Sequence, residues 1–367
     1  MYKTLASFSL FLFFYINGLA QKPISLDTIN WNINAKSYVL EPLKGKDAIY
    51  LQAGSIALKD ASFLNGTIEY DIYMKETRGF PGVYFRTNGS NSEQFYIRPH
   101  QSGNPDANQA IGLINGISAW QLYFGPKYSF PYKYPVDEWM HVKIVVDGDK
   151  AQVYLDNADK PNLSWKLFHE AKSGGVSFTG GGVSGMHLAN IKINSNTHNI
   201  KNFNPGERKQ IEGAISQWEI SDKFEEKLLN ETNALRSVIA NRKWGDKIVL
   251  EEGVAANISR KVQLRNNQPG NTVFAKITIT ATKDETKLFE FGYSDRVVVI
   301  LNGQPIYKGN NGFRTRDYRY LGTIGLFDAV YLNLKKGKNT LLMAVSENFG
   351  GWLITGRFPN QNSLKVE

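Results

Sequence analysis

Residues 137–156 read DEWMHVKIVVDGDKAQVYLD and predict two strands joined by a tight turn. Apolar and polar residues alternate on both sides of Asp147-Gly148, and a two-residue period is typical of half-buried β-strands. Asp-Gly between two such runs favours a hairpin, because both residues adopt positive φ readily. We therefore expect an antiparallel hairpin with strands over 139–146 and 151–155.

The same period extends through the rest of the first half. Thr67–Met74 alternates over its whole length, and Val83–Arg86 and Gln94–Arg98 alternate over shorter runs. Short strands punctuated by glycine are expected from Gly174 to Ile193. The polar stretch 195–213 contains several Asn residues, a Pro and a Gly, and is typical of a linker.

The second half predicts a helix followed by further strands. Asp222 and Glu225 form a capping pair, and the apolar residues that follow recur at helical spacing: Phe224, Leu228, Leu235 and Ile239. Strands are expected from Lys247 onward, notably over 273–282, 287–291, 297–301 and 340–345. The chain thus predicts an all-β fold of two β-sandwich (jelly-roll) domains joined by a linker and a short helix.

Length and composition agree with two domains. A chain of 367 residues exceeds the roughly 250–300 residues at which single cores stop growing. We place the first domain at 21–197, the linker at 198–213 and the second domain, with its N-terminal helix, at 214–367. The chain has no Cys, so each domain is expected to be stable without disulfides.

Residues 1–20 are expected to be a signal peptide. Lys3 precedes an apolar run from Leu5 to Ile16, and Gly18-Leu19-Ala20 supplies the small residues that a signal peptidase reads before Gln21. The run is shorter than the ~20 apolar residues of a spanning helix, and no later stretch predicts a membrane span. We expect export to a periplasm or to the cell exterior.

The charge is unevenly distributed. The formal net charge is +9, of which +1 lies in residues 21–197 and +7 in residues 198–367. A basic second half is either a solvated surface or a surface for a polyanion such as an acidic glycan. Nucleic acid is not expected to be a partner of an exported protein.

Two resemblances indicate carbohydrate. The hairpin at 137–156 and the closing segment Met186–Ile193 resemble the late strands of laminin-G-type, concanavalin A-like sandwiches. Within that superfamily, residues 22–193 are most similar to bacterial 3-keto-disaccharide hydrolase-like domains. In the second half, Val298–Tyr307 and Leu334–Leu341 resemble galactose-binding-like jelly rolls that are appended to glycosidases. The matching residues are turn and strand residues, so the resemblance implies a fold and, through it, a glycan-related role.

A two-carboxylate glycosidase mechanism is not expected. One family of concanavalin A-like glucanases carries Glu-x-Asp-x-x-Glu on a single strand, and the nearest sequence here is Glu69-Tyr70-Asp71-Ile72-Tyr73-Met74. Met74 replaces the last carboxylate on the apolar face. Since glycoside hydrolysis normally needs a pair of carboxylates, we expect Glu69 and Asp71 to lie on a solvated strand face.

Strand alternation indicates a candidate ligand face. Val83, Phe85, Phe95 and Ile97 are expected to point into the core. Tyr rings stack on sugar rings, and Arg and Gln donate to hydroxyls or carboxylates. The opposite face then gathers Tyr84, Arg86, Gln94, Tyr96, Arg98 and His100, with Gln121 and Tyr123, beside Trp120 on a later strand, extending it. The alternative is a polar outer face without a ligand.

His100 is the candidate general base, since its reference pKa is near 6.5. The polar loop 101–109 follows it and could rim the face. A basic, aromatic loop at 308–320 is the second candidate region, with Arg314, Arg316 and Arg319; it is either solvated, a site for an anionic or sugar ligand, or a contact with the first domain. No His spacing indicates a metal site. No cofactor is expected with certainty, although such sandwiches often hold a structural calcium ion.

Three functions stay open at this stage. The first is an exported, two-module carbohydrate-binding protein whose partner is an oligo- or polysaccharide, with an anionic one among the candidates. The second, implied by the resemblance, is a glycoside hydrolase- or lyase-like enzyme acting on 3-keto-glycosides, with His100 and Arg86 or Arg98 as base and donor. The third is a structural module pair without a glycan ligand.

Overall fold

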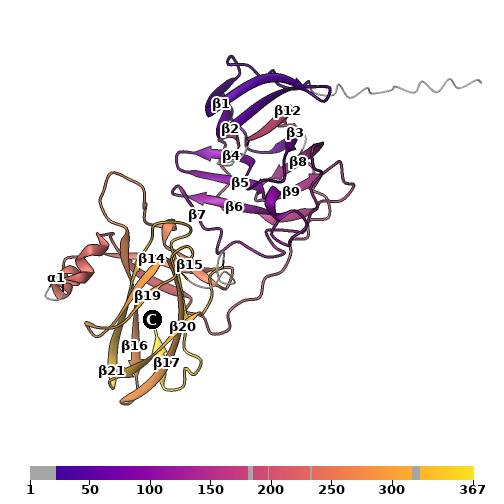
Figure 1. Ribbon diagram of the computed structural model, residues 1–367. Helices are drawn as coiled ribbons and strands as arrows, with labels where there is room; N and C mark the ends of the chain where they lie inside the picture. The colour runs from indigo at the N-terminus through magenta and orange to yellow at the C-terminus, as the bar shows by residue number, and fades with distance from the viewer. Residues whose placement is uncertain (1–21, 181–184, 197, 232–233, 316–322) are drawn as a thin grey trace, which may run out of the picture.

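A computed structural model describes residues 22–180, 185–196, 198–231, 234–315 and 323–367. The expected signal peptide at 1–20 lies outside the described residues. Strands dominate the two halves, which Figure 1 shows as two bodies stacked end to end. Each half contains one large antiparallel sheet that folds over a core, so the prediction of two β-sandwich domains is confirmed. No helix in the described part of the chain has the length and apolar character needed to cross a bilayer.

The first domain is one hydrogen-bonded sheet in the order β10-β9-β8-β3-β12-β2-β11-β4-β5-β6-β7, with β1 paired to β2. The predicted hairpin is present as β8 and β9, next to the edge strand β10. Its elements are β1 (Trp31–Leu43), β2 (Lys46–Leu58), β3 (Gly66–Met74), β4 (Gly82–Asn88), β5 (Asn91–Ile97), the 3-10 helix η1 (Pro99–Gln101), β6 (Asn108–Ile114), β7 (Ile117–Ser118), β8 (Trp139–Asp147), β9 (Lys150–Leu155), β10 (Leu163–Lys166), β11 (Gly175–Thr179) and β12 (Gly185–Asn194).

The sheet becomes a sandwich because β2 bends. Residues 48–52 of β2 pair with β12, whereas residues 55–57 pair with β11. Gly54 lies between them, and a Cβ on it would come within 2.3 Å of the backbone of Ala35, so no larger residue fits. The two layers then face each other across the core. Tyr70 of β3 meets Phe178 of β11 at 5.0 Å between ring centroids.

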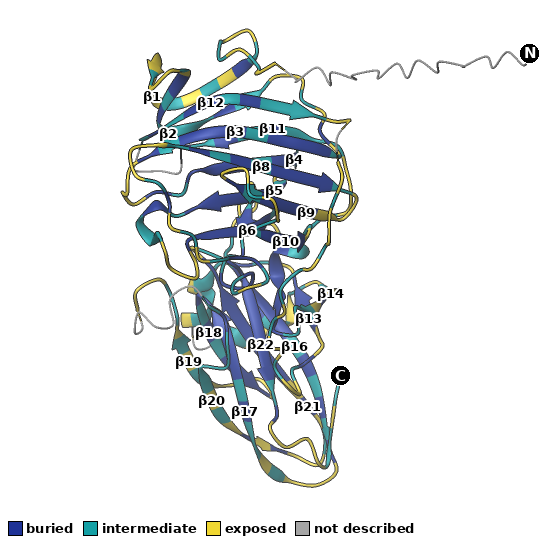
Figure 2. Cartoon of the chain, turned by 90° about the vertical axis from the view of Figure 1, so that its right-hand side faces the viewer, coloured by how far each residue is buried: buried dark blue, intermediate teal, exposed yellow. Residues whose placement is uncertain are grey.

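The second domain has the order β19-β18-β21-β16-β13-β14-β15-β22-β17-β20, with β23 paired to β16. β14 connects its two layers by pairing with β13 and then with β15. Figure 2 shows buried strands running along both domains. The elements of the second domain are β13 (Gln217–Ser221), the 3-10 helix η2 (Glu226–Asn230), α1 (Leu235–Ala240), β14 (Trp244–Glu251), β15 (Ala255–Asn257), the 3-10 helix η3 (Ile258–Arg260), β16 (Thr272–Ala281), β17 (Glu285–Ser294), β18 (Arg296–Leu301), β19 (Gln304–Asn310), β20 (Asp328–Leu334), β21 (Gly337–Ser346), β22 (Leu353–Arg357) and β23 (Leu364–Val366).

The short helix predicted near the start of the second domain is present in two pieces that follow a strand. The domain begins with strand β13, and only two short helical pieces, η2 and α1, follow it. Asp222 does not cap a helix; its carboxylate accepts from the backbone N–H of Lys243 at 2.8 Å. The apolar spacing reflects packing against β16, because Phe224 and Val238 are buried beside Phe274.

The polar segment 198–211 contains no strand or helix, yet it is held against both domains. Gln152 of β9 accepts from Lys201 N at 3.1 Å, and Ile211 N donates to Gly253 O at 2.8 Å. Arg208 lies 4.1 Å from the ring centroid of Phe124. The segment is therefore a strap along the domain boundary.

The two domains share buried contacts. Val254, Ala255 and Leu353 of the second domain belong to the same buried apolar cluster as the first domain's core. Tyr123 donates to Glu251 at 2.7 Å, and Arg260 binds the same carboxylate through two nitrogens at 2.9 Å. This packing fixes the loops of both domains around one cleft.

Candidate functional site

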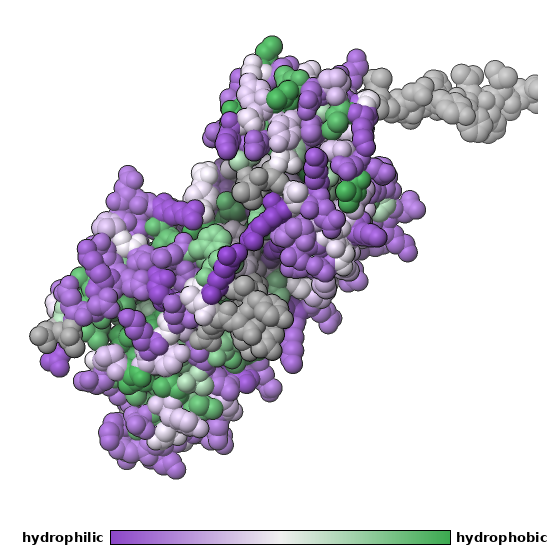
Figure 3. All heavy atoms as spheres, viewed as in Figure 1, coloured by the Kyte–Doolittle hydropathy of each residue, from purple (hydrophilic) through white to green (hydrophobic). Residues whose placement is uncertain are grey.

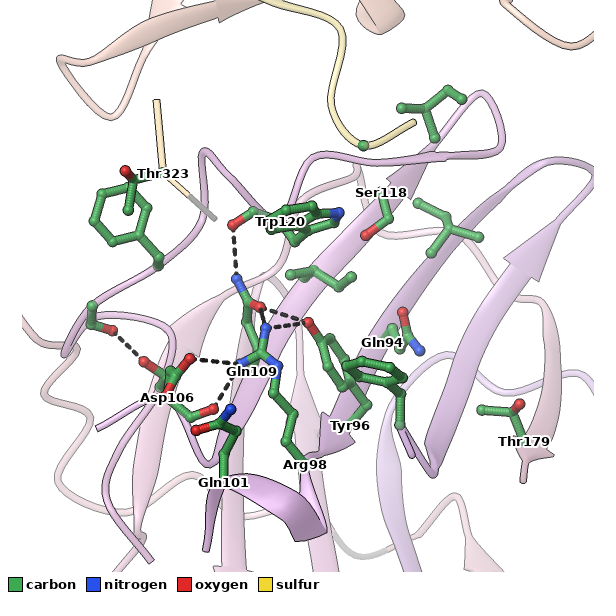
Figure 4. A pocket seen from close by; sticks show the side chains of 18 of the residues that line it. Gln94, Tyr96, Arg98, Gln101, Asp106, Gln109, Ser118, Trp120, Thr179 and Thr323 are labelled. Carbon is green, nitrogen blue, oxygen red and sulfur yellow. Dashed lines mark hydrogen bonds and ion pairs between the residues drawn. The ribbon is translucent and has the colours of Figure 1, made fainter. Parts of the chain in front are cut away.

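A cleft of about 970 Å³ lies where the two domains meet. Its floor is formed by β4, β5 and β6 with η1, and its far wall by second-domain loops around residues 265, 313, 323 and 349–350. In Figure 3, hydrophobic side chains are visible at this junction, as they are on the face of the second domain. Figure 4 shows side chains from the first domain lining the floor.

The floor follows from strand alternation in β4 and β5. Val83, Phe85 and Phe95 are fully buried in the core. Tyr84 and Gln94, which are cross-strand neighbours, instead line the cleft, as does Tyr96 farther along β5. In the regular parts of β4 and β5, the residues predicted to point away from the core therefore lie at the cleft.

Arg98 holds the centre of a polar network in the cleft. Its guanidinium donates to Asp106 O at 2.7 Å and to the Tyr96 hydroxyl at 2.6 Å, and it also binds Gln109 Oε1. Gln109 in turn donates to Trp120 O at 3.0 Å, which ties β6 to the next loop (Figure 4). Burial raises the pKa of Tyr96 to about 12, although Arg98 opposes the shift, so the hydroxyl stays protonated at neutral pH.

His100 lies at the same end of the cleft, in η1. Its ring packs edge-on against Phe80 at 5.4 Å, and its Nδ1 is buried without a hydrogen-bond partner among the described residues. Burial, together with the charges of Arg78 and Arg98, lowers the pKa of His100 below its usual value. Burial and these charges therefore favour the neutral imidazole.

Beyond Gln109, the lining of the cleft is aromatic. Trp120 is half-buried and lies 6.4 Å from Phe349, which in turn meets Phe313 at 5.5 Å. Phe349 and Phe313 are 54% and 42% exposed, so large apolar faces are left open to the cleft. Exposed aromatic faces of this kind are suited to stacking on sugar rings.

The prediction for Arg86 is wrong, because the alternation of β4 ends before it. A bulge interrupts the β4–β5 register after Phe85, and Arg86 has φ of +52°. Arg86 is 5% exposed and donates to Leu64 O, Asn65 Oδ1 and Gly148 O at 2.7–3.0 Å. It closes two loops of the sandwich and does not line the cleft.

Gln121 and Tyr123 also lie outside the cleft lining, since residues 119–123 form a turn where a strand was predicted. Leu122 N and Tyr123 N both bond to Ala119 O. Gln121 therefore faces the second domain, where its Oε1 accepts from Gly351 N at 2.7 Å. Tyr123 is 1% exposed and holds Glu251, so both residues join the domains.

The basic loop of the second domain is described only in part. Arg314 stacks on Phe313 at 5.1 Å, whereas Arg316 and Arg319 lie outside the described residues. Sequence reasoning did not single out Phe349 or Arg265 from the second domain, nor Arg78. The available sequence signal for this loop was the Gly350-Gly351 pair after Phe349. In the structure, Gly351 packs against Ala119 of the first domain, where a Cβ would come within 2.8 Å.

Asp71 is not on a solvated face, contrary to expectation. It is 5% exposed, and its carboxylate binds Lys46 at 2.7 Å, His141 at 2.8 Å and Asn190 at 2.6 Å. Burial opposes its ionisation, but these hydrogen bonds lower the pKa of Asp71 to about 2. Hydrogen bonds to Asp71 and Glu69 raise the pKa of His141 to about 9. This cluster lies outside the cleft lining.

The cleft offers limited catalytic apparatus. Among the described residues that line it, Asp106 is the one carboxylate, whereas a two-carboxylate glycosidase mechanism uses a pair. Within the described ranges, no three His, Cys, Asp or Glu residues are grouped to hold a metal ion. Among the described residues that line the cleft, His100 is the one imidazole, and it lies beside Arg98.

No family model matches the chain, and no curated protein matches it. Solved structures similar to part of it include the carbohydrate-binding module CBM66 from Bacillus subtilis, at 18% identity and a TM-score of 0.36, covering 45% of this chain and 96% of that one. A Bacteroides ovatus GH16 protein in complex with a product has 12% identity and a TM-score of 0.35, over 46% and 96%. A β-1,3-glucanase from Mycobacterium marinum has 11% identity and a TM-score of 0.31, over 46% and 92%. With TM-scores below 0.5, function is inferred from the chain's own residues.

Proposed function

We propose that this protein binds an oligo- or polysaccharide in the cleft between its two domains. The observation that carries the proposal is that exposed aromatic side chains, Phe313 and Phe349 beside Trp120, line the same cleft as the polar donors and acceptors of its floor. Sugars present apolar ring faces and hydroxyl edges, and this cleft supplies a partner for each. Arginines outnumber carboxylates there, so the ligand class includes anionic saccharides.

The proposal extends to the setting and the ancestry of the domains. We propose that the chain is exported, with cleavage before Gln21, and that its halves are a concanavalin A-like and a galactose-binding-like sandwich. N-terminal sequencing of the mature protein tests the first point. An intact Met1 on the soluble protein would contradict export.

Glycan-array screening followed by calorimetric titration tests the binding function. We expect Trp120→Ala to weaken binding of the identified ligand at least about tenfold, which corresponds to about 1.4 kcal/mol of binding free energy. Tyr331→Ala is the matched control, because Tyr331 is 69% exposed and lies outside the cleft lining. Equal affinity of Trp120→Ala and wild type, in a protein that melts normally, would contradict binding at the cleft.

A second candidate function is favoured by the neutral, unpartnered His100. On a 3-keto-glycoside the carbonyl acidifies the adjacent C2–H. His100 would take that proton while the C1–O bond breaks, a C1=C2 bond forms, and the leaving oxygen takes a proton from water. Under this function His100→Ala abolishes turnover of a 3-keto-glycoside but retains binding, whereas His198→Ala, at a half-exposed surface site, retains both.

A further inference from the structure

Positive charge in the cleft is concentrated and largely uncompensated. Arg78, Arg98 and Arg265 line it, against the carboxylate of Asp106. Arg78 and Arg265 are exposed, and neither forms an ion pair or a hydrogen bond with another described residue. Among the described lining residues the balance is therefore three guanidinium groups to one carboxylate.

The charge of Arg98 is the best defined of the three. Its side chain is 13% exposed, and the acceptors that hold it are neutral: a backbone carbonyl, a phenol and an amide. The Asp106 carboxylate is 4.0 Å away and 62% exposed, so water screens that pair. A cation held by neutral acceptors keeps its full charge. Its electrostatic potential therefore acts on a ligand that occupies the cleft.

Arg78 and Arg98 act at one place. Both charges reach His100, where they favour the neutral imidazole. Phe80 packs between this region and Tyr96, at 5.4 Å from His100 and 6.0 Å from Tyr96. These contacts place Arg78, Arg98 and His100 together at one end of the cleft, which we name the cationic end. Trp120, Phe313 and Phe349 form the aromatic end.

We infer that the cleft selects an acidic saccharide, with the anionic group of one sugar bound at the cationic end and a neighbouring ring stacked at the aromatic end. This inference rests on the proposed function and specifies its ligand. A planar guanidinium donates in parallel to two oxygens of a carboxylate or sulfate, which makes arginine the natural partner of both groups. The shared chemistry is a multi-oxygen anion carried on a sugar ring.

Calorimetric titration of the full mature protein at two salt concentrations tests the inference. The probes are an oligogalacturonate, a sulfated galactan oligosaccharide and an unsulfated galactan oligosaccharide of equal length. We expect one of the acidic probes to bind at least about tenfold more tightly than the neutral probe, with the advantage shrinking as salt rises. Whichever acidic probe prevails identifies carboxylate or sulfate as the group recognised.

Arg78→Gln locates the effect. We expect it to reduce the affinity for the acidic probe about five- to tenfold more than the affinity for the neutral probe. Arg236→Gln, an exposed arginine on α1 that is absent from the cleft lining, should behave as wild type. Arg98→Gln should reduce the affinity for the acidic probe further. A melting curve of this variant identifies any part of the reduction that is due to unfolding.

The two levels of proposal fail separately. Equal binding of acidic and neutral probes would overturn the inference and leave saccharide binding in place. If the acidic probe still binds more tightly than the neutral probe in both Arg78→Gln and Arg98→Gln, the anion binds elsewhere, and the inference is also overturned. If no saccharide binds at millimolar concentration, the proposed function itself fails.

Discussion

Arg86 and Arg98 show how one residue type takes two roles in neighbouring strands. Both are partly or wholly removed from solvent, and both donate mainly to neutral acceptors. Arg86 satisfies carbonyls of its own sandwich, and replacing it would leave buried acceptors without donors. Arg98 faces a cleft, so its charge is available to a ligand. The difference is set by a single bulge at the end of β4.

The Glu69–Asp71–His141 cluster predicts how stability depends on pH. The pKa of His141 is raised to about 9 by hydrogen bonds to Asp71 and Glu69, so its stabilising effect is complete below its unfolded pKa of about 6.5 and is lost as pH rises through 9. Thermal melts from pH 6 to 10 should therefore show a falling midpoint. His141→Gln should be less stable near pH 6 and should flatten this fall.

At acid pH, the same cluster makes stability fall as the pH is lowered. The pKa of Asp71 is lowered to about 2, so its contribution is complete above about pH 4 and is lost as pH falls toward 2. His198→Gln serves as the control, since His198 is 43% exposed and only touches Asp147 at 3.3 Å. An unchanged pH profile in His141→Gln would show that the cluster does not couple to folding.

At the scale of elements, regular strands were predictable from the sequence and their interruptions were not. The hairpin of β8 and β9 and the alternation of β5 follow from a two-residue period. Successive side chains of a strand point to opposite faces of the sheet, and burial of one face therefore requires this period. Arg86 departs from that period because of a bulge, and Gln121 and Tyr123 depart because their segment is a turn. Both features depend on the packing of distant segments, which no local pattern records.

The second domain's part of the cleft was harder to anticipate for the same reason. Phe349 reaches the cleft because its loop is fixed from two sides. Asp295 Oδ2 accepts from Asn348 N at 2.9 Å and Phe349 N at 3.0 Å, while Gln121 of the first domain holds Gly351. Asp295 is 3% exposed, so these bonds are shielded from water. We regard Asp295 as a positioning residue for the aromatic end.

This role predicts coupling between Asp295 and Phe349. Asp295→Ala should weaken ligand binding about three- to tenfold by releasing the loop, and Phe349→Ala should do the same by removing the ring. Because both changes remove one interaction, the double variant should lose less than the sum, with a coupling energy of about 0.5–3 kcal/mol in calorimetric titrations.

The matched control is Asp284→Ala, at the opposite end of β17. Asp284 also accepts from a loop N–H, that of Lys336 at 2.7 Å, but it is 61% exposed and absent from the cleft lining. It should leave affinity unchanged. Additive losses for Asp295 and Phe349 would mean that Asp295 stabilises the domain without positioning the ring.

At the scale of the whole molecule, the cleft belongs to neither domain alone. The floor comes from β4–β6, and the exposed aromatic wall comes from loops of the second domain. Tyr123, Glu251 and Arg260 lock the two at fixed distances, and Lys127 pairs with Glu252 at 2.6 Å nearby. Two sandwiches that could each be stable are thereby joined around one cleft.

This arrangement predicts distinct fates for folding and for binding in the fragment 21–197. Its own layers contain a full aromatic core, including Tyr70, Phe95, Trp165 and Phe178, so it should fold alone and melt cooperatively. Separation exposes Tyr123 and the apolar surface beside Val254 and Leu353, so its melting midpoint should lie below that of the intact chain. Saccharide binding should weaken at least about tenfold, because Phe349 is missing while Trp120 and Arg98 remain.

Three measurements separate the outcomes: a calorimetric melt, a titration of the fragment, and a titration of intact Phe349→Ala. If the fragment binds as weakly as intact Phe349→Ala, the second domain contributes its aromatic wall and little else. If the fragment binds much more weakly than that variant, the interface also holds the floor in its binding shape, since Gln121, next to Trp120, accepts from Gly351 of the second domain. If the fragment is soluble only when residues 214–367 are added, the buried contacts between the halves make one core, and the boundary at 197 is wrong.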